Sequence, residues 1–232
     1  MYKSLEEIIK LANSQIGYKE TGNNHTKYSQ YFDNNDGAWQ WFNTKKQGSE
    51  WCAIFICWLF TQVIGNKPAL SFLGCPAPKN NCAAGCGYLY DYMKSKGYKS
   101  TINNCKVGDI VFFKNGSKCS HVGICVEANE KSIYTVEGNK DNQVKKVQHN
   151  RTSNIYFGVM APDYSKAIWV GESNTKPKDD REQLYINLAH KCIQGFYGNG
   201  LIRKKKLNSL GYGDIYTKVQ NYVNLILAGK VK

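Results

Sequence analysis

The chain has 232 residues and a formal net charge of +13, with 42% hydrophobic and 13% aromatic residues. Such a composition indicates a folded protein and excludes a disordered chain. The basic charge predicts an anionic partner (nucleic acid, a membrane surface or an acidic cell wall), and charge alone does not choose among them. No apolar run is long enough to span a bilayer, and residues 1–10 lack the apolar stretch of a signal peptide. We therefore expect synthesis in the cytoplasm and no stable membrane insertion.

Cysteine is abundant, with nine residues in the chain. Because no signal peptide is visible, we expect reduced thiols rather than a disulfide framework. Cys75, Cys82 and Cys86 could form a zinc site with Cys105, Cys119 or a histidine as fourth ligand, but they lack the paired Cys-x-x-Cys spacing of such sites. We expect no metal and no other cofactor.

Helices are predicted in the first part of the chain. From Leu5 onward, apolar residues recur at helical spacing until Gly17 ends the helix. A polar, turn-rich stretch follows, and then an apolar run too short to cross a bilayer, which predicts a buried helix. A segment rich in Pro, Gly and Cys comes next. The predicted ranges are a helix at 5–16, a loop or short helices at 18–48, a helix at 49–64, an irregular segment at 68–87 and a helix at 89–95.

Strands are predicted next, linked by turns such as Asn115-Gly116. Helices followed by hairpin-linked strands predict an α+β domain with an antiparallel sheet. Beyond a Pro- and Ser-containing linker, three helices separated by glycines form a small module. The predicted strands are 109–113, 121–128, 132–138 and 155–160, and the tail helices are 182–193, 201–210 and 216–227. The predicted boundaries are an α+β domain at 1–162, a linker at 163–181 and the helical module at 182–232.

Cys52 stands at the start of the long apolar helix. Ser49 suits the N-cap and Glu50 the first turn, which places Cys52 near the helix N-terminus. Unpaired N–H groups and the positive end of the helix dipole favour the thiolate there, and the thiolate is the nucleophile. Cys57 lies about 140° further round the helix and cannot share that position. A buried structural cysteine is the alternative for Cys52 taken by itself.

His121 is the best-placed candidate base, because it opens an alternating strand directly after a turn. The other histidines lie in a polar loop, a charged stretch and a tail helix, and they are His25, His149 and His190. Glu137 and Asn139 share one face of the next predicted strand. Either side chain could bond the second ring nitrogen of His121 and fix its tautomer. We predict a nucleophile, a base and an orienting residue in the order Cys52, His121, then Glu137 or Asn139, with Glu137 favoured.

These residues lie in motifs that resemble the CHAP family, the cysteine, histidine-dependent amidohydrolases/peptidases of peptidoglycan hydrolases. The matching motifs are Glu50-Trp51-Cys52-Ala53, Val107-Gly108-Asp109-Ile110, His121-Val122-Gly123-Ile124 and Glu137-Gly138-Asn139. The resemblance covers roughly residues 1–162, and the motifs occur in the family's order. It implies a papain-like α+β domain that cleaves an amide or peptide bond of the bacterial wall without a metal. The segment with Cys75, Cys82 and Cys86 departs from the family pattern.

The tail resembles the CW-seven cell-wall-binding repeat of phage endolysins. The resemblance rests on Gly195-Phe196-Tyr197-Gly198-Asn199-Gly200, Arg203-Lys204, Gly211-Tyr212 and Val219-Gln220. The family usually has Trp at the position of Tyr197. The resemblance implies docking onto muropeptide, with Gly198, Asn199 and Arg203 as candidate ligand contacts. Glycine permits close backbone approach, and Asn and Arg can donate to sugar amides or carboxylates.

Together the two resemblances imply an endolysin, a peptidoglycan hydrolase released through holes made by a separate holin. Either an N-acetylmuramoyl-L-alanine amidase or a stem or cross-bridge endopeptidase fits the same residues. A catalytically inactive wall-binding or adhesion protein is the alternative from another class. The basic run Lys204-Lys205-Lys206 could suggest nucleic-acid binding, but it is more typical of the solvated face of a helix, and we expect no nucleic-acid partner.

Overall fold

The structure is a computed structural model that describes residues 2–34, 41–76, 82–167, 180–209 and 215–228. The chain divides into two compact units, Met1–Val170 and Gly171–Lys232. Most of the predicted linker at 163–181 lies outside the described residues. Its first residues belong to the first unit, because Tyr164 is buried there and donates a hydrogen bond to the carbonyl oxygen of Gly108 at 2.7 Å.

The first unit contains a six-stranded sheet in the order β1-β6-β2-β3-β4-β5, in which every neighbouring pair is antiparallel. Its strands are β1 (Lys99–Ser100), β2 (Ile110–Asn115), β3 (Lys118–Ala128), β4 (Ser132–Glu137), β5 (Lys145–Asn150) and β6 (Tyr156–Met160). The predicted α+β class is confirmed. The sequence interpretation missed β1 and β5. In β5 almost every side chain is polar, so no hydrophobic alternation marks it as a strand.

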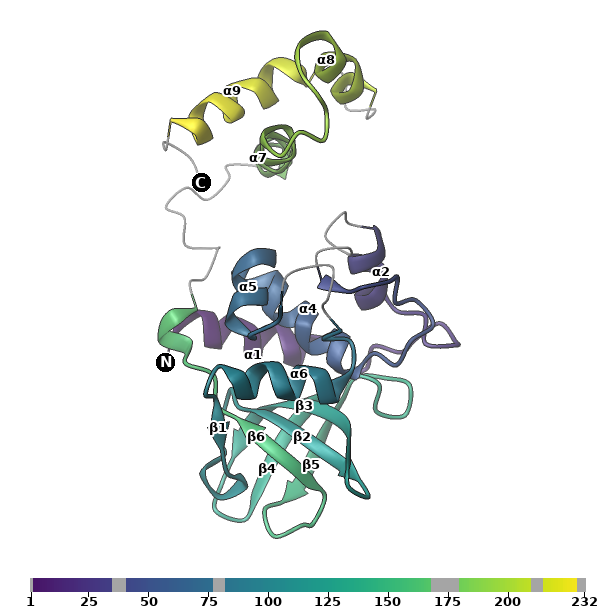
Figure 1. The fold of residues 1–232 in the computed structure, drawn as a ribbon, viewed down its shortest axis with the longest axis vertical. Helices are drawn as coiled ribbons and strands as arrows, with labels where there is room; N and C mark the ends of the chain where they lie inside the picture. The colour runs from purple at the N-terminus through teal and green to yellow at the C-terminus, as the bar shows by residue number, and fades with distance from the viewer. Residues whose placement is uncertain (1, 35–40, 77–81, 168–179, 210–214, 229–232) are drawn as a thin grey trace. The chain divides into compact units, whose positions relative to one another are not determined.

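The helices of the first unit precede most of the sheet in the chain and, in Figure 1, several of them lie against one side of it. They are α1 (Lys3–Ser14), α2 (Lys27–Asn34), α4 (Cys52–Ile64), α5 (Asn66–Phe72) and α6 (Cys86–Ser95). Two predictions were wrong here. Helix α5 occupies part of the segment predicted as irregular, because Pro68 falls in its first turn, where a missing N–H costs little. Helix α6 begins at Cys86, earlier than predicted.

The core lies between the helices and one face of the sheet. Helix α4 is apolar all round and nearly all of its residues are buried, as expected for a helix in the middle of a core. It packs with alternate residues of the strands, among them Ile110, Phe112, Val122, Ile124 and Val136. A smaller apolar cluster covers the opposite face of the sheet and includes Val111, Phe113, Cys125, Ile133 and Val159.

The start of α4 differs from the prediction in its capping. Trp51, not Ser49, is the N-cap, and it makes no side-chain capping hydrogen bond. The backbone N–H of Phe55 donates to the carbonyl oxygen of Trp51 at 2.9 Å, which sets the first helical turn. The Trp51 indole is buried and donates to Glu20 at 2.9 Å, so tertiary packing fixes this terminus instead of a local polar cap. Cys52 therefore becomes the first residue of the helix.

Gly138 gives a direct test of the packing between β4 and α4. A Cβ atom added there would lie 2.6 Å from the Cβ of Phe55, which the buried helix cannot easily move away. We expect Gly138→Ala to lower the free energy of unfolding by about 1–3 kcal/mol, as overpacking does, measured by urea denaturation. Gly87→Ala is the matched control, because its added Cβ comes no closer than 4.0 Å to Cys119. An equal loss in both variants would contradict the packing argument.

The second unit is the predicted three-helix module, formed by α7 (Asp180–Ile193), α8 (Gly200–Asn208) and α9 (Tyr216–Leu227). Among its described residues, the small core contains Leu188, Ala189, Cys192, Leu207, Ile215, Val219 and Val223. Among the residues that the structure describes, no helix of either unit is long and apolar enough to cross a bilayer.

Candidate active site

Cys52 lies where helix α4 begins, as the sequence predicted. Its side chain faces the start of the helix, where the backbone N–H of Ala53 contacts the sulfur and favours its ionised form. The residue is only 6% exposed. The helix start thus supplies one contact that favours the thiolate of Cys52, in a site that is nearly closed to solvent.

Cys86 is a second cysteine at a helix start, and it contacts the first. It begins α6, and its sulfur is in hydrogen-bonding contact with those of Cys119 and Cys52. The Sγ atom of Cys86 also lies 3.5 Å from the carbonyl oxygen of Cys119, which accepts a hydrogen bond only when Cys86 carries its proton. Three thiols therefore share this site. The sequence interpretation did not find the contact, since it placed Cys86 in an irregular segment.

The sulfur contacts set the charge of Cys52. The hydrogen bond to Cys86 and then burial raise the pKa of Cys52 well above its usual range. Hydrogen bonds from Cys119 and Cys52, the Gly87 N–H group and the nearby His121 ring lower the pKa of Cys86. Because like charges in contact repel, at most one of the three cysteines is a thiolate at a time. Ionisation of Cys52 therefore competes with ionisation of Cys86, a competition that the helix-start argument from the sequence did not include.

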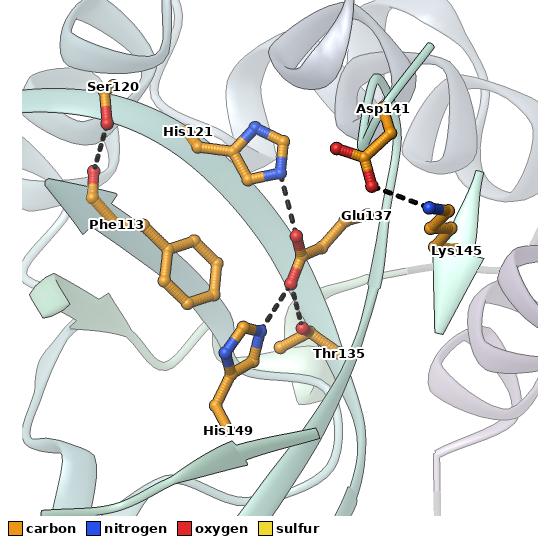
Figure 2. A network of polar contacts seen from close by, with 8 residues as sticks. All are labelled: Phe113, Ser120, His121, Thr135, Glu137, Asp141, Lys145 and His149. Atoms are coloured by element: carbon orange, nitrogen blue, oxygen red, sulfur yellow. Dashed lines mark hydrogen bonds and ion pairs between the residues drawn. The ribbon is translucent and has the colours of Figure 1, made fainter. Parts of the chain in front are cut away.

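His121 and Glu137 meet directly. The Nε2 atom of His121 on β3 lies 2.9 Å from Oε2 of Glu137 at the end of β4 (Figure 2). Burial, which leaves the Glu137 side chain 1% exposed, would raise its pKa, but hydrogen bonds from His121, His149 and Thr135 outweigh burial and lower the pKa to about 2. An ionised carboxylate only accepts hydrogen bonds, so His121 donates from Nε2. Its Nδ1 atom is then the nitrogen left to act as a base.

A second histidine occupies the other oxygen of Glu137. The Nε2 atom of His149 on β5 lies 2.6 Å from Oε1 of Glu137, and the Thr135 hydroxyl donates to the same oxygen at 2.5 Å (Figure 2). The sequence interpretation passed over His149 because it lies in a charged stretch. The only available signal was the position of that stretch after a turn from the strand that carries Glu137.

Asn139 has different partners. It follows the end of β4 with a positive φ of 58°. Its side-chain nitrogen donates to Glu50, two residues before α4, and to Asn24 at 3.4 Å. Of the two predicted orienting residues, Glu137 is therefore the one hydrogen-bonded to His121, while Asn139 ties the end of β4 to the segment that leads into Cys52.

The contacts among the three cysteines link Cys52 to His121. Cys86, which contacts Cys52, is close enough to His121 for their charges to interact. The backbone N–H of His121 contacts the sulfur of Cys119, the third thiol. Residues from the two helix starts and from β3 are thus gathered around one point. Within the described part of the chain, no cluster of His, Cys, Asp or Glu residues is arranged to hold a metal ion.

In the second unit the predicted ligand contacts lie together. The Arg203 guanidinium donates to the carbonyl oxygen of Gly198 at 2.9 Å, to the Asn199 side chain at 3.1 Å and to Gln220 on α9 at 3.0 Å. These bonds join α8, α9 and the glycine-rich loop before α8, and they give Arg203 a structural role in the unit. Ligand binding by Gly198, Asn199 and Arg203 stays a prediction.

The fold and this grouping of thiols, imidazole and carboxylate define the chain as an α+β protein with a cysteine–histidine site. The family model of the CHAP domain matches residues 43–139, and that of the CW_7 repeat matches residues 187–227. The chain therefore carries a CHAP domain, which belongs to a family of cysteine, histidine-dependent amidohydrolases/peptidases, followed by a CW_7 repeat. The CHAP match includes Cys52, His121, Glu137 and Asn139, whereas His149 lies beyond it. No curated protein matches the chain.

Proposed function

We propose that the protein is an endolysin, a peptidoglycan hydrolase that cuts an amide or peptide bond of the bacterial wall by thiol catalysis. The observation that carries this proposal is the hydrogen bond between His121 and Glu137, in a CHAP domain whose Cys52 begins α4 and is linked to His121 through Cys86. This is the combination that thiol acyl transfer needs, namely a nucleophile, a base and a group that orients the base.

The mechanism begins with transfer of the Cys52 thiol proton to Nδ1 of His121. The sulfur then attacks the carbonyl carbon, and backbone N–H groups at the start of α4 stabilise the oxyanion. His121 returns the proton to the leaving amine as the C–N bond breaks, which leaves an acyl-enzyme. Water, deprotonated by His121, releases the acyl group and regenerates the thiol. Glu137 stays ionised throughout and stabilises the imidazolium.

Two bonds suit this mechanism, the N-acetylmuramoyl-L-alanine amide and a peptide bond of the stem or cross-bridge. Mass spectrometry of the muropeptides released from purified walls distinguishes them, because the amidase frees intact peptides from the glycan whereas the endopeptidase leaves peptide stubs on it. Release of neither product by the folded protein would contradict the proposal.

The CW_7 unit would dock the enzyme onto muropeptide, and the basic charge would add attraction to an anionic wall that weakens with salt. We expect a chain ending at Ala167 to keep its fold and its cut site but to sediment far less with purified walls. Sedimentation and circular dichroism of the full and shortened chains check this. Undiminished sedimentation of the shortened chain would assign wall binding to the first unit.

The proposed setting follows from the function. The enzyme would be made in the cytoplasm of an infected bacterium and reach the wall through holes made by a separate holin.

A wall-binding protein without hydrolytic activity is the second candidate, and the burial of Cys52 favours it. Turbidity of a wall suspension separates the two, because a hydrolase clears it and a binder only sediments with it.

A further inference from the structure

The pair His149–Glu137 lies on the side of the carboxylate away from His121 (Figure 2). The His149 side chain is 11% exposed and that of Glu137 is 1% exposed. The imidazole packs on the ring of Phe113 at 4.7 Å between ring centroids, and the same ring lies 5.9 Å from that of His121. One phenyl ring thus supports both histidines, which come from β3 and β5, on either side of the strand that carries Glu137.

A buried carboxylate needs donors on both oxygens. His121 supplies the donor to Oε2, while His149 and Thr135 supply the donors to Oε1. Without His149 the Thr135 hydroxyl would be the remaining hydrogen-bond donor to Oε1, and the carboxylate would rotate more freely about the Cγ–Cδ bond of Glu137. Each such rotation would move Oε2 away from the His121 ring and misalign Nδ1. Misplacement of a catalytic group by a fraction of an ångström is enough to slow a reaction.

We propose that His149 is a positioning residue, whose Nε2–H holds the Glu137 carboxylate in the plane that directs Oε2 to His121. The proposal rests on the function given above, since it assigns His149 to the orientation of the catalytic base. The proposal adds His149, which lies beyond the CHAP match, to the predicted nucleophile, base and orienting residue.

Other groups near Glu137 do not replace His149. Asp141 and Lys145 form an ion pair with each other at 2.6 Å (Figure 2). Arg151, which follows β5, donates to the backbone carbonyl oxygens of Ile102 and Cys105. Tyr156 donates to the carbonyl oxygen of Asn150 at 2.8 Å. The hydrogen-bond donors to Oε1 of Glu137 are therefore His149 and Thr135.

The kinetic test uses the full chain with His149→Ala and His149→Gln. We expect His149→Ala to lower kcat on purified wall fragments about tenfold with little change in KM, because the base is present but poorly aligned. Glutamine can donate an N–H from nearly the same place but does not titrate, so His149→Gln should recover most of the loss. Gln148→Ala is the matched control, because it removes a hydrogen bond of 3.1 Å to Ser132 across the same pair of strands.

The outcomes are distinct. A kcat of wild-type size in His149→Ala would overturn the proposal, and so would an equal loss in His149→Gln and His149→Ala when both are folded by circular dichroism. An equal loss in Gln148→Ala would assign the effect to the strand pair and also overturn it.

Proton NMR provides a readout that does not depend on hydrolysis. The His121 and His149 N–H protons bonded to Glu137 should give low-field imidazole resonances in the wild-type protein. In His149→Ala we expect the His121 resonance to move or broaden, and an unchanged resonance would overturn the proposal. If the wild-type protein releases no muropeptide at all, the proposed function fails, yet this measurement still decides whether His149 positions Glu137.

Discussion

Replacing Cys52 with alanine is expected to abolish clearing of purified walls, with a loss on the order of 10³-fold or more, since no other group of the mechanism can form the acyl-enzyme. The side chain lies at the start of α4, where alanine is well tolerated, so the variant should fold. Turbidity loss and release of muropeptides measure the effect. Sedimentation with walls should be unchanged, because the CW_7 unit is intact.

Cys86→Ala is the matched control, because this second thiol also begins a helix and contacts Cys52. The hydrogen bond to Cys86 is the largest cause that raises the pKa of Cys52. Its removal should therefore make Cys52 ionise more readily, and iodoacetamide should label Cys52 faster at a fixed pH. Mass spectrometry of the labelled peptides identifies the cysteine. An active Cys52→Ala together with an inactive Cys86→Ala would transfer the role of nucleophile to Cys86.

The sequence was sufficient where one chain segment determined the chemistry. The apolar run that begins near Cys52 had to be a buried helix, and the alternation around His121 had to be a strand. Both predictions are confirmed. Neighbouring antiparallel strands bring residues of one face together, which left Glu137 and Asn139 as candidates, and Glu137, the favoured one, is hydrogen-bonded to His121.

The sequence was insufficient where contacts depend on tertiary packing. The approach of Cys86 to Cys52 requires two helix starts to meet, and no local pattern encodes that meeting. Strand β5, which carries His149, is at the edge of the sheet and its side chains are mostly polar. It therefore has no hydrophobic alternation from which a strand could be predicted. The cap of α4 was also set by burial of the Trp51 ring and not by the nearby serine. Local polarity misled the prediction in β5 and at the start of α4, whereas the Cys86–Cys52 contact has no local signal at all.

Glu137→Gln is expected to lower kcat by a factor on the order of 10² to 10⁴, because a neutral amide neither stabilises the imidazolium nor accepts three donors. The amide oxygen can accept from His121, but its NH₂ group would then face the Thr135 hydroxyl and the His149 N–H, which also donate. Turnover on wall fragments, measured across pH, checks this. Asn139→Ala should lose less, since that side chain bonds to Glu50 and Asn24. The reverse ranking would assign the orienting role to Asn139.

The same substitution has a stability signature whose sign is fixed. The pKa of Glu137 is lowered to about 2 from an ordinary 4.5, which corresponds to on the order of 3 kcal/mol of stability for this buried group. A carboxyl group whose pKa is lower in the folded than in the unfolded protein adds its full contribution to the free energy of unfolding above the unfolded-state pKa. That contribution is lost as the pH falls through the folded-state pKa. Urea denaturation should therefore show Glu137→Gln to be less stable than wild type at pH above 4.5, with the gap closing between 4.5 and 2. A gap that is constant with pH would mean that the carboxylate is not held ionised by its neighbours, and the catalytic role of the His121–Glu137 pair would lose its electrostatic basis.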